Sequence, residues 1–194
     1  MEFVAASELK GILEDNDLEQ LPPENDCIFL GMLGDEVTRH HFVPADGEAP
    51  VPRPVADGAI VHRVSIERVH EVFEGIIHRL HLDQVVIVPV ARWSHLFDGI
   101  AFSLAENEDW QEFDAAATVE RNTRDPLLVL PADFPTIADV MMALLRDCEE
   151  LAQSVMVLSP AVPLLVTLVP GGTMQVACGT PVIADELTDI LEKV

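Results

Sequence analysis

The stretch SIERVHEVFEGIIHRLHLDQVVIVPV, residues 65–90, decides the expected fold. Its first part places apolar side chains on one helical face, which predicts an amphipathic helix: Ile66, Val69, Phe73, Ile76, Ile77 and Leu80. Gln84–Val90 is a continuous Val/Ile run, which is typical of a buried central strand. A helix of this kind needs an apolar surface to cover, and the strand predicts a sheet that provides one.

The same alternation of helix and strand continues toward the C-terminus. The pattern predicts strands at Ile100–Leu104, Phe113–Glu120, Leu127–Leu130, Ser154–Leu158, Val162–Val169 and Thr173–Cys178. A second amphipathic helix starts at Thr136 and runs toward Leu151, and a third starts at Pro181 with Thr180 as its cap. Residues 65–90 align on residues 136–161 with matches such as Ile66 with Ile137, so a duplicated helix–strand unit is one possible origin of the pattern.

The N-terminal part differs in composition from the rest. Ser7 can cap a helix over Glu8–Gln20 that Pro22 and Pro23 end, and Cys27–Leu33 with Val37–Val43 predict a β-hairpin. Residues 45–58 place proline at every second position from 50 to 54, which favours an extended linker. The predicted organisation is therefore a helix plus hairpin at 1–44, a linker at 45–58 and a main domain at 59–194.

These elements predict an α+β fold, with a mainly antiparallel sheet covered by amphipathic helices and an N-terminal helix–hairpin extension. Runs of strands between helices are typical of this class, in which helices cover one face of the sheet. The sequence therefore predicts that the other face, or an edge, is free for self-association.

Composition excludes several classes of protein. The chain has 194 residues, 49% of them hydrophobic, and a formal net charge of −23. Direct nucleic-acid binding, binding to a membrane surface and disorder are all poor interpretations, because each needs positive charge or low hydrophobicity. Three cysteines without a CxxC pair indicate neither a disulfide framework nor a zinc ribbon. An acidic N-terminus without a leader pattern, and an apolar stretch at Val155–Val169 broken by prolines, predict a cytoplasmic protein.

The common catalytic signatures are absent, and one helix offers the nearest approach to a metal motif. His70, Glu74 and His78 lie one turn apart on the helix over 65–81, where imidazoles and a carboxylate could face an ion. Three successive turns span about 12 Å, so two of the three could share one ion but all three could not. The alternative is a polar helix flank with i,i+4 pairs. Cys178 precedes a predicted helix and is a candidate nucleophile or a packing residue.

Aromatic residues suggest a contact surface. Trp110 lies in the acidic segment Glu106–Asp114, and an aromatic side chain inside a charged rim is the usual composition of a binding hot spot. We therefore predict partner binding by Trp110, Phe113 and Trp93, with the pinning of a long hairpin as the alternative. The remaining histidines are predicted to be strand residues, caps or solvated side chains: His40, His41, His62, His81 and His95.

The order of elements over 59–194 and the acidity are similar to those of the small acidic chaperones of bacterial type III secretion. This resemblance implies a homodimer that holds extended client segments, and the N-terminal helix–hairpin has no counterpart in it. The leading hypothesis is a non-enzymatic acidic protein-interaction module, homodimeric, with a protein partner and no cofactor. One alternative is a metal-dependent hydrolase that uses the cluster on helix 65–81. Another is an acidic nucleic-acid mimic that blocks a basic protein.

Overall fold

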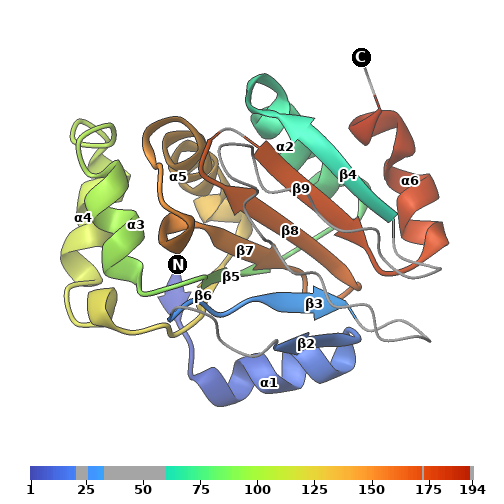
Figure 1. Cartoon of the computed structure of the whole chain (residues 1–194), viewed down its shortest axis with the longest axis horizontal. Coiled ribbons are helices and arrows are strands. Elements are labelled where there is room, and N and C mark those ends of the chain that lie inside the picture. The colour runs from blue at the N-terminus through green and yellow to red at the C-terminus, as the bar shows by residue number, and fades with distance from the viewer. Residues whose placement is uncertain (21–25, 33–59, 172, 193–194) are drawn as a thin grey trace.

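A seven-stranded antiparallel sheet organises the described part of the chain, which comprises residues 1–20, 26–32, 60–171 and 173–192 of a computed structural model (Figure 1). Across the sheet the strand order is β1-β6-β5-β7-β8-β9-β4. Its strands are β1 (Glu2–Phe3), β4 (Ile60–Ser65), β5 (Val85–Pro89), β6 (Leu127–Val129), β7 (Val155–Leu158), β8 (Leu164–Val169) and β9 (Thr173–Cys178). The fold is therefore α+β, as the sequence predicted.

Helices cover one face of this sheet. They are α2 (Val69–Arg79), α3 (Trp93–Ile100), α4 (Glu108–Ala116), α5 (Phe134–Asp147) and α6 (Pro181–Leu191). Alternate strand residues such as Val85, Ile87 and Val157 pack in one core cluster with these helices. Because side chains alternate between the two faces of a strand, the residues between them must face the other way.

The opposite face has a cover of its own. Helix α1 (Ala6–Asp15) and the two-stranded sheet of β2 (Leu18–Gln20) and β3 (Leu30–Met32) pack there. A second core cluster joins Val86, Val88 and Met156 of the sheet to Leu9 and Leu30 of this cover. The prediction that the face away from the helices stays free was thus wrong for the part that α1, β2 and β3 cover. Burial on both faces also explains why β5 is apolar at every position.

Most predicted elements of the main domain are confirmed. The amphipathic helix after Ser65 is a short 3-10 turn followed by α2, and the central strand is β5 between β6 and β7. Thr180 caps α6 as predicted, since its hydroxyl accepts from the Ile183 backbone N–H at 3.3 Å. Residues 65–90 and 136–161 each form a helix followed by a strand. The two strands, β5 and β7, are antiparallel neighbours in which Ile87 pairs with Val157.

Two predicted strands are wrong, because the chain forms helix and turn there. Ile100 is the last residue of α3 and residues 101–104 form a turn, while residues 113–116 belong to α4. In α3 the buried side chains Trp93, Leu96, Phe97 and Ile100 have helical spacing, which the short apolar run at 100–104 concealed. Asn107 caps α4 by accepting from the Trp110 N–H at 2.9 Å.

The N-terminal elements also differ from the prediction. Helix α1 ends at Asp15 instead of Gln20, its N-cap is Ala5 rather than Ser7, and Leu18–Gln20 form β2. The Asn16 side chain donates to the Ile12 carbonyl at 2.9 Å and thereby closes the helix early. In the described segments β3 pairs with β2, while Val37–Val43 and residues 45–58 lie outside them.

Besides β2, two further strands have no counterpart in the prediction. The two residues of β1 pair with β6, and β4 pairs with β9 over six residues. Among the helices that the structure describes, none combines the length and the apolarity that crossing a bilayer requires.

Candidate functional site

The predicted metal cluster lies on the exposed flank of α2. His70, Glu74 and His78 are all solvent-exposed, and the His70 Nδ1 atom lies 3.7 Å from a Glu74 carboxylate oxygen. Over the described ranges, no group of three or more His, Cys, Asp or Glu side chains is arranged to hold a metal ion. The structure therefore pairs two of the three residues without converging them on one point, and His78 takes part in a different feature.

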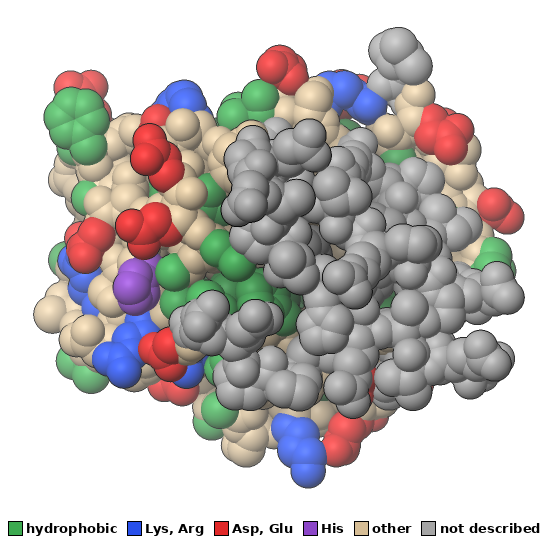
Figure 2. Space-filling model, viewed as in Figure 1, with side chains coloured by type: hydrophobic (Ala, Val, Ile, Leu, Met, Phe, Trp, Pro, Cys, Tyr) green, Lys and Arg blue, Asp and Glu red, His purple; other side chains and the backbone are tan. Residues whose placement is uncertain are grey.

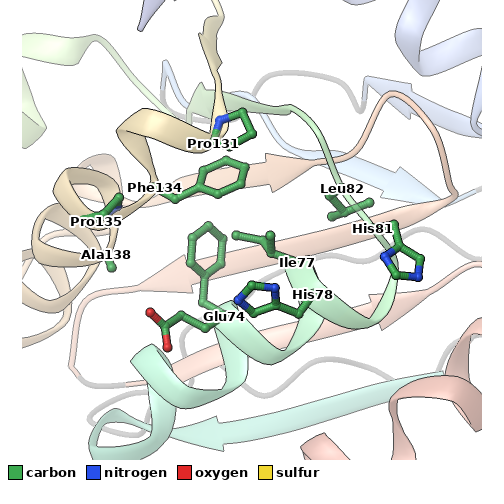
Figure 3. A pocket seen from close by; sticks show the side chains of 10 residues that line it. Glu74, Ile77, His78, His81, Leu82, Pro131, Phe134, Pro135 and Ala138 are labelled. Carbon is green, nitrogen blue, oxygen red and sulfur yellow. The ribbon is translucent and has the colours of Figure 1, made fainter.

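That feature is a groove of about 370 Å³ between α2 and the start of α5, here named the α2–α5 groove (Figure 3). Ten residues line it: Phe73, Glu74, Ile77, His78, His81, Leu82, Pro131, Phe134, Pro135 and Ala138. Seven of these side chains are apolar, and the three polar ones are Glu74 and two histidines. The ten include no Ser, Thr, Cys or Lys, so the candidate nucleophiles among them are Glu74 and the two histidines.

The apolar walls come from two helices that the sheet brings together. Phe73 of α2 and Phe134 of α5 meet edge to face, with their ring centroids 6.3 Å apart. Pro131 opens a 3-10 turn, and Pro135 lies in the first turn of α5, so the chain enters the helix beside α2 with fixed backbone angles. The groove is thus preformed by packed rings and prolines.

The polar side of the groove follows from the end of α2. Glu74 and His78 are four residues apart and share one face of the helix, and Figure 3 shows them next to each other. His81 comes directly after the helix cap and has a left-handed backbone with φ of 51°. The N–H of Leu82 then donates to the Ile77 carbonyl at 3.0 Å, which closes the helix in a Schellman motif and turns Leu82 toward the groove.

The predicted partner-binding aromatics are brought together, but in the core. Trp93 is 2% and Trp110 is 3% exposed, and Phe113 is half-buried. Phe97 lies between them, with its ring centroid 5.0 Å from that of Trp110 and 5.6 Å from that of Trp93. The Trp93 indole N–H donates to the Asp125 carbonyl at 2.8 Å. These two indoles therefore have no free surface to offer a partner in this fold.

Exposed apolar side chains lie elsewhere. Phe102, in the turn between α3 and α4, is 93% exposed, and Val182 at the start of α6 is 71% exposed. On the face that Figure 2 shows, acidic side chains are dispersed over the described surface and do not form a row. A row would be the arrangement expected of a mimic of the nucleic-acid backbone.

Within the described ranges, the cysteines and the other histidines do not gather into a second cluster of metal-binding type. Cys178 is fully buried at the end of β9, and burial raises the pKa of its thiol to about 11. This is the opposite of the activation that a nucleophile needs. His95 is exposed on α3, His62 lies in β4, and His40 and His41 fall outside the described residues.

Sequence reasoning found part of the groove and missed the rest. Glu74 and His78 could be identified by their spacing on one helix. Phe134, Pro131 and Leu82 could not be assigned to the groove, because the apolar pattern of a helix does not indicate which other helix packs against it. The run Glu74-x3-His78-x2-His81 was the one available clue.

Searches against protein-family models, curated proteins and solved structures found no match for this chain.

Proposed function

We propose that this chain is a non-enzymatic protein-interaction module that holds large apolar side chains of a partner segment in the α2–α5 groove. The supporting observation is the lining of the groove, in which seven of ten side chains are apolar and the three polar ones, Glu74, His78 and His81, are solvent-exposed. Recognition sites for ligands are mostly apolar with a few placed polar groups, and this groove has that composition.

The size of the groove suits side chains of a peptide. Its volume of about 370 Å³ lies at the lower end of the roughly 300–1,000 Å³ that ligand pockets have. That is space for one or two large apolar side chains and too little for a folded domain. Edge-to-face packing of Phe73 and Phe134 keeps the walls in place, so binding would cost little ordering of the protein itself.

The charge of the chain selects the chemistry of the partner. A net charge of −23 repels acidic segments and attracts basic ones over several ångströms. Within the lining, Glu74 is the only carboxylate and no Lys or Arg is present, so a cation beside the bound apolar side chain meets an anion. The proposed partner is therefore a basic segment with large apolar side chains.

A metal-dependent hydrolase has less support. The three residues on which it depends, His70, Glu74 and His78, do not converge in the described structure, and the groove that contains two of them is mostly apolar.

A peptide-binding experiment tests the proposal. The probe is an N-acetylated, fluorescein-labelled peptide, KKLFKKLLKK, and the matched peptide KKSSKKSSKK keeps the charge without the apolar side chains. Fluorescence anisotropy at pH 8 and about 150 mM salt, where long-range attraction is screened, should give at least tenfold tighter binding of the apolar peptide. Equal affinity for the two peptides would mean that charge alone holds them, and the proposal would be wrong.

Variants locate the site. Phe134→Ala removes one wall, and Ala138→Leu fills the groove, so each should abolish the preference for the apolar peptide. Val182→Ala is the control. It shortens an apolar side chain at the start of α6 that is 71% exposed, and it should leave the preference for the apolar peptide intact. Circular dichroism establishes that each variant is folded. A preference that survives in both folded groove variants would place binding elsewhere.

A further inference from the structure

The residue that follows the C-cap of α2 is a histidine, although the backbone conformation at this position favours glycine. His81 occupies the left-handed position of the Schellman motif, where glycine is the common residue because it has no Cβ. A non-glycine residue there costs free energy, and such strain persists at sites where the side chain has a use. The imidazoles of His81 and His78 both line the α2–α5 groove, and Figure 3 shows the two rings apart, with His78 the one beside Glu74.

The charged groups around the groove are few. On α2, Glu74 and His78 line the groove, whereas His70, whose Nδ1 lies 3.7 Å from a Glu74 carboxylate oxygen, is outside the lining. Glu71 and Arg79 of α2 are also outside the lining, and Arg79 pairs with Asp189 of the neighbouring helix α6 at 2.9 Å. The chain after α2 contributes His81 and the exposed Asp83.

The opposite wall adds little charge. Pro131, Phe134, Pro135 and Ala138 are neutral, and the nearby Asp133 carboxylate is 2.6 Å from the Met1 ammonium, with which it forms an ion pair. Histidines therefore decide the charge of the lining.

We propose that His78 and His81 make the α2–α5 groove release a basic segment as the pH falls. This inference rests on the proposed function and concerns the regulation of the same site. As both imidazoles gain protons, the formal charge of the groove lining changes from minus one to plus one, because Glu74 supplies its one carboxylate. Imidazoles make this change between about pH 5 and 8. A cation that Glu74 attracts above that range is repelled below it.

The neighbouring groups act in the same direction. A protonated His70 pairs more strongly with Glu74 and withdraws that carboxylate from the bound cation. The Asp83 carboxylate keeps its negative charge and so opposes the gain of positive charge in the groove. It is a single exposed group, whereas two histidines belong to the lining. The sign of the effect is therefore set by His78 and His81.

The test measures the affinity of the apolar probe KKLFKKLLKK at pH 8 and pH 5.5. Its lysines keep their charge over this range, and tetramethylrhodamine replaces fluorescein as the label here because the fluorescein phenol titrates within the range, so changes in affinity report on the protein. Wild type should lose at least fivefold in affinity at the lower pH. The double variant His78→Gln with His81→Asn should lose less than half of that factor, because asparagine tolerates the left-handed backbone and neither side chain titrates. His95→Gln, on the exposed surface of α3, should behave like wild type.

The outcomes separate this inference from the proposed function. No preference for the apolar probe at pH 8 overturns the proposed function. A preference at pH 8, with the same pH dependence in wild type and the double variant, overturns the role of the histidines alone.

A second variant tests whether His81 is merely structural. His81→Gly should raise the melting temperature, because glycine adopts φ of 51° without strain, and should also weaken the pH dependence of binding. An unchanged or lower melting temperature would show that the backbone prefers histidine for a reason of packing, and the inference would lose its basis.

Discussion

Burial controls the chemistry of two single side chains, Cys178 and Cys148. Cys178 is 0% and Cys148 is 3% exposed, and both pack in the core beneath the helices. Burial raises the pKa of each thiol to about 11, with the Asp147 carboxylate as a further cause for Cys148. An apolar core disfavours a thiolate because it cannot solvate the charge. Both thiols are therefore packing residues that stay protonated at neutral pH.

These thiols predict how stability depends on alkaline pH. A thiol of the unfolded chain loses its proton near pH 8.5 to 9, whereas the folded protein holds it up to about pH 11. The contribution of each protonated thiol to the free energy of unfolding is therefore complete below about pH 9 and is lost as the pH rises toward 11. It is on the order of 2–3 kcal/mol for each thiol. Urea unfolding at pH 8, 9, 10 and 11 measures it.

The composition of the chain limits the number of other groups that could change the unfolding free energy in this pH range. The chain has no tyrosine, and Lys10 and Lys193 are its only lysines, so few other side chains titrate in that range. Cys178→Ala should remove about half of the decrease of the unfolding free energy above pH 9, because Cys148 keeps its own share. The same decrease in the variant would show that the Cys178 thiol is not its source.

At the scale of elements, α6 depends on a residue outside it. The Arg68 guanidinium, at the start of the α2 region, donates to the Ile190 carbonyl at 2.6 Å and to the Leu191 carbonyl at 3.4 Å. The last carbonyls of a helix have no partner within the helix, and a cation there also interacts favourably with the helix dipole. Arg68 therefore joins the end of α6 to the start of α2.

Removal of this contact should cost stability. Arg68→Ala leaves the two carbonyls without their charged donor, and the expected loss is about 1.5–3 kcal/mol in urea unfolding. Arg146→Ala is the control: this exposed guanidinium bonds to its sequence neighbour Asp147, and its removal should cost well under 1 kcal/mol. Equal losses in the two variants would contradict the capping role.

At the scale of the whole molecule, charge opposes folding. A formal net charge of −23 on 194 residues produces self-repulsion that the compact state feels more than the unfolded chain. The surface ion pairs, such as Arg79 with Asp189 at 2.9 Å, are local and largely solvated, so they offset little of it.

Salt should therefore stabilise the protein. Between about 10 mM and 0.5 M NaCl the screening length falls from roughly 30 Å to under 5 Å, and the melting temperature should rise by several degrees. The same salt series at pH 5, closer to the isoelectric point of about 4.3, should give a smaller rise. Differential scanning fluorimetry measures both. A melting temperature that is insensitive to salt at pH 7 would show that repulsion does not limit stability.

The elements that could be predicted were those whose own side chains repeat with one period. In α2, α5 and α6 the apolar residues have helical spacing, and β5, β7, β8 and β9 are runs of β-branched and apolar residues. Such periodic patterns involve only residues that are close in the chain, so they can be recognised in the sequence whatever the helix or strand packs against. The charge and the lack of common catalytic motifs are equally local. His70, Glu74 and His78 were predicted as one cluster for the same reason.

Only the tertiary structure decided which surfaces meet. Because β5 lies between β6 and β7, the helix that connects these two strands crosses over β5, and this places Phe134 beside Phe73. Tertiary packing also buried Trp110 despite its acidic neighbours, since one side of α4 could cover the core while the other remained in water. Contacts between residues far apart in the chain depend on the order of the strands in the sheet. That order cannot be read from the periodic pattern of any single helix or strand. The groove and its pairing of apolar walls with histidines therefore emerged from the fold alone.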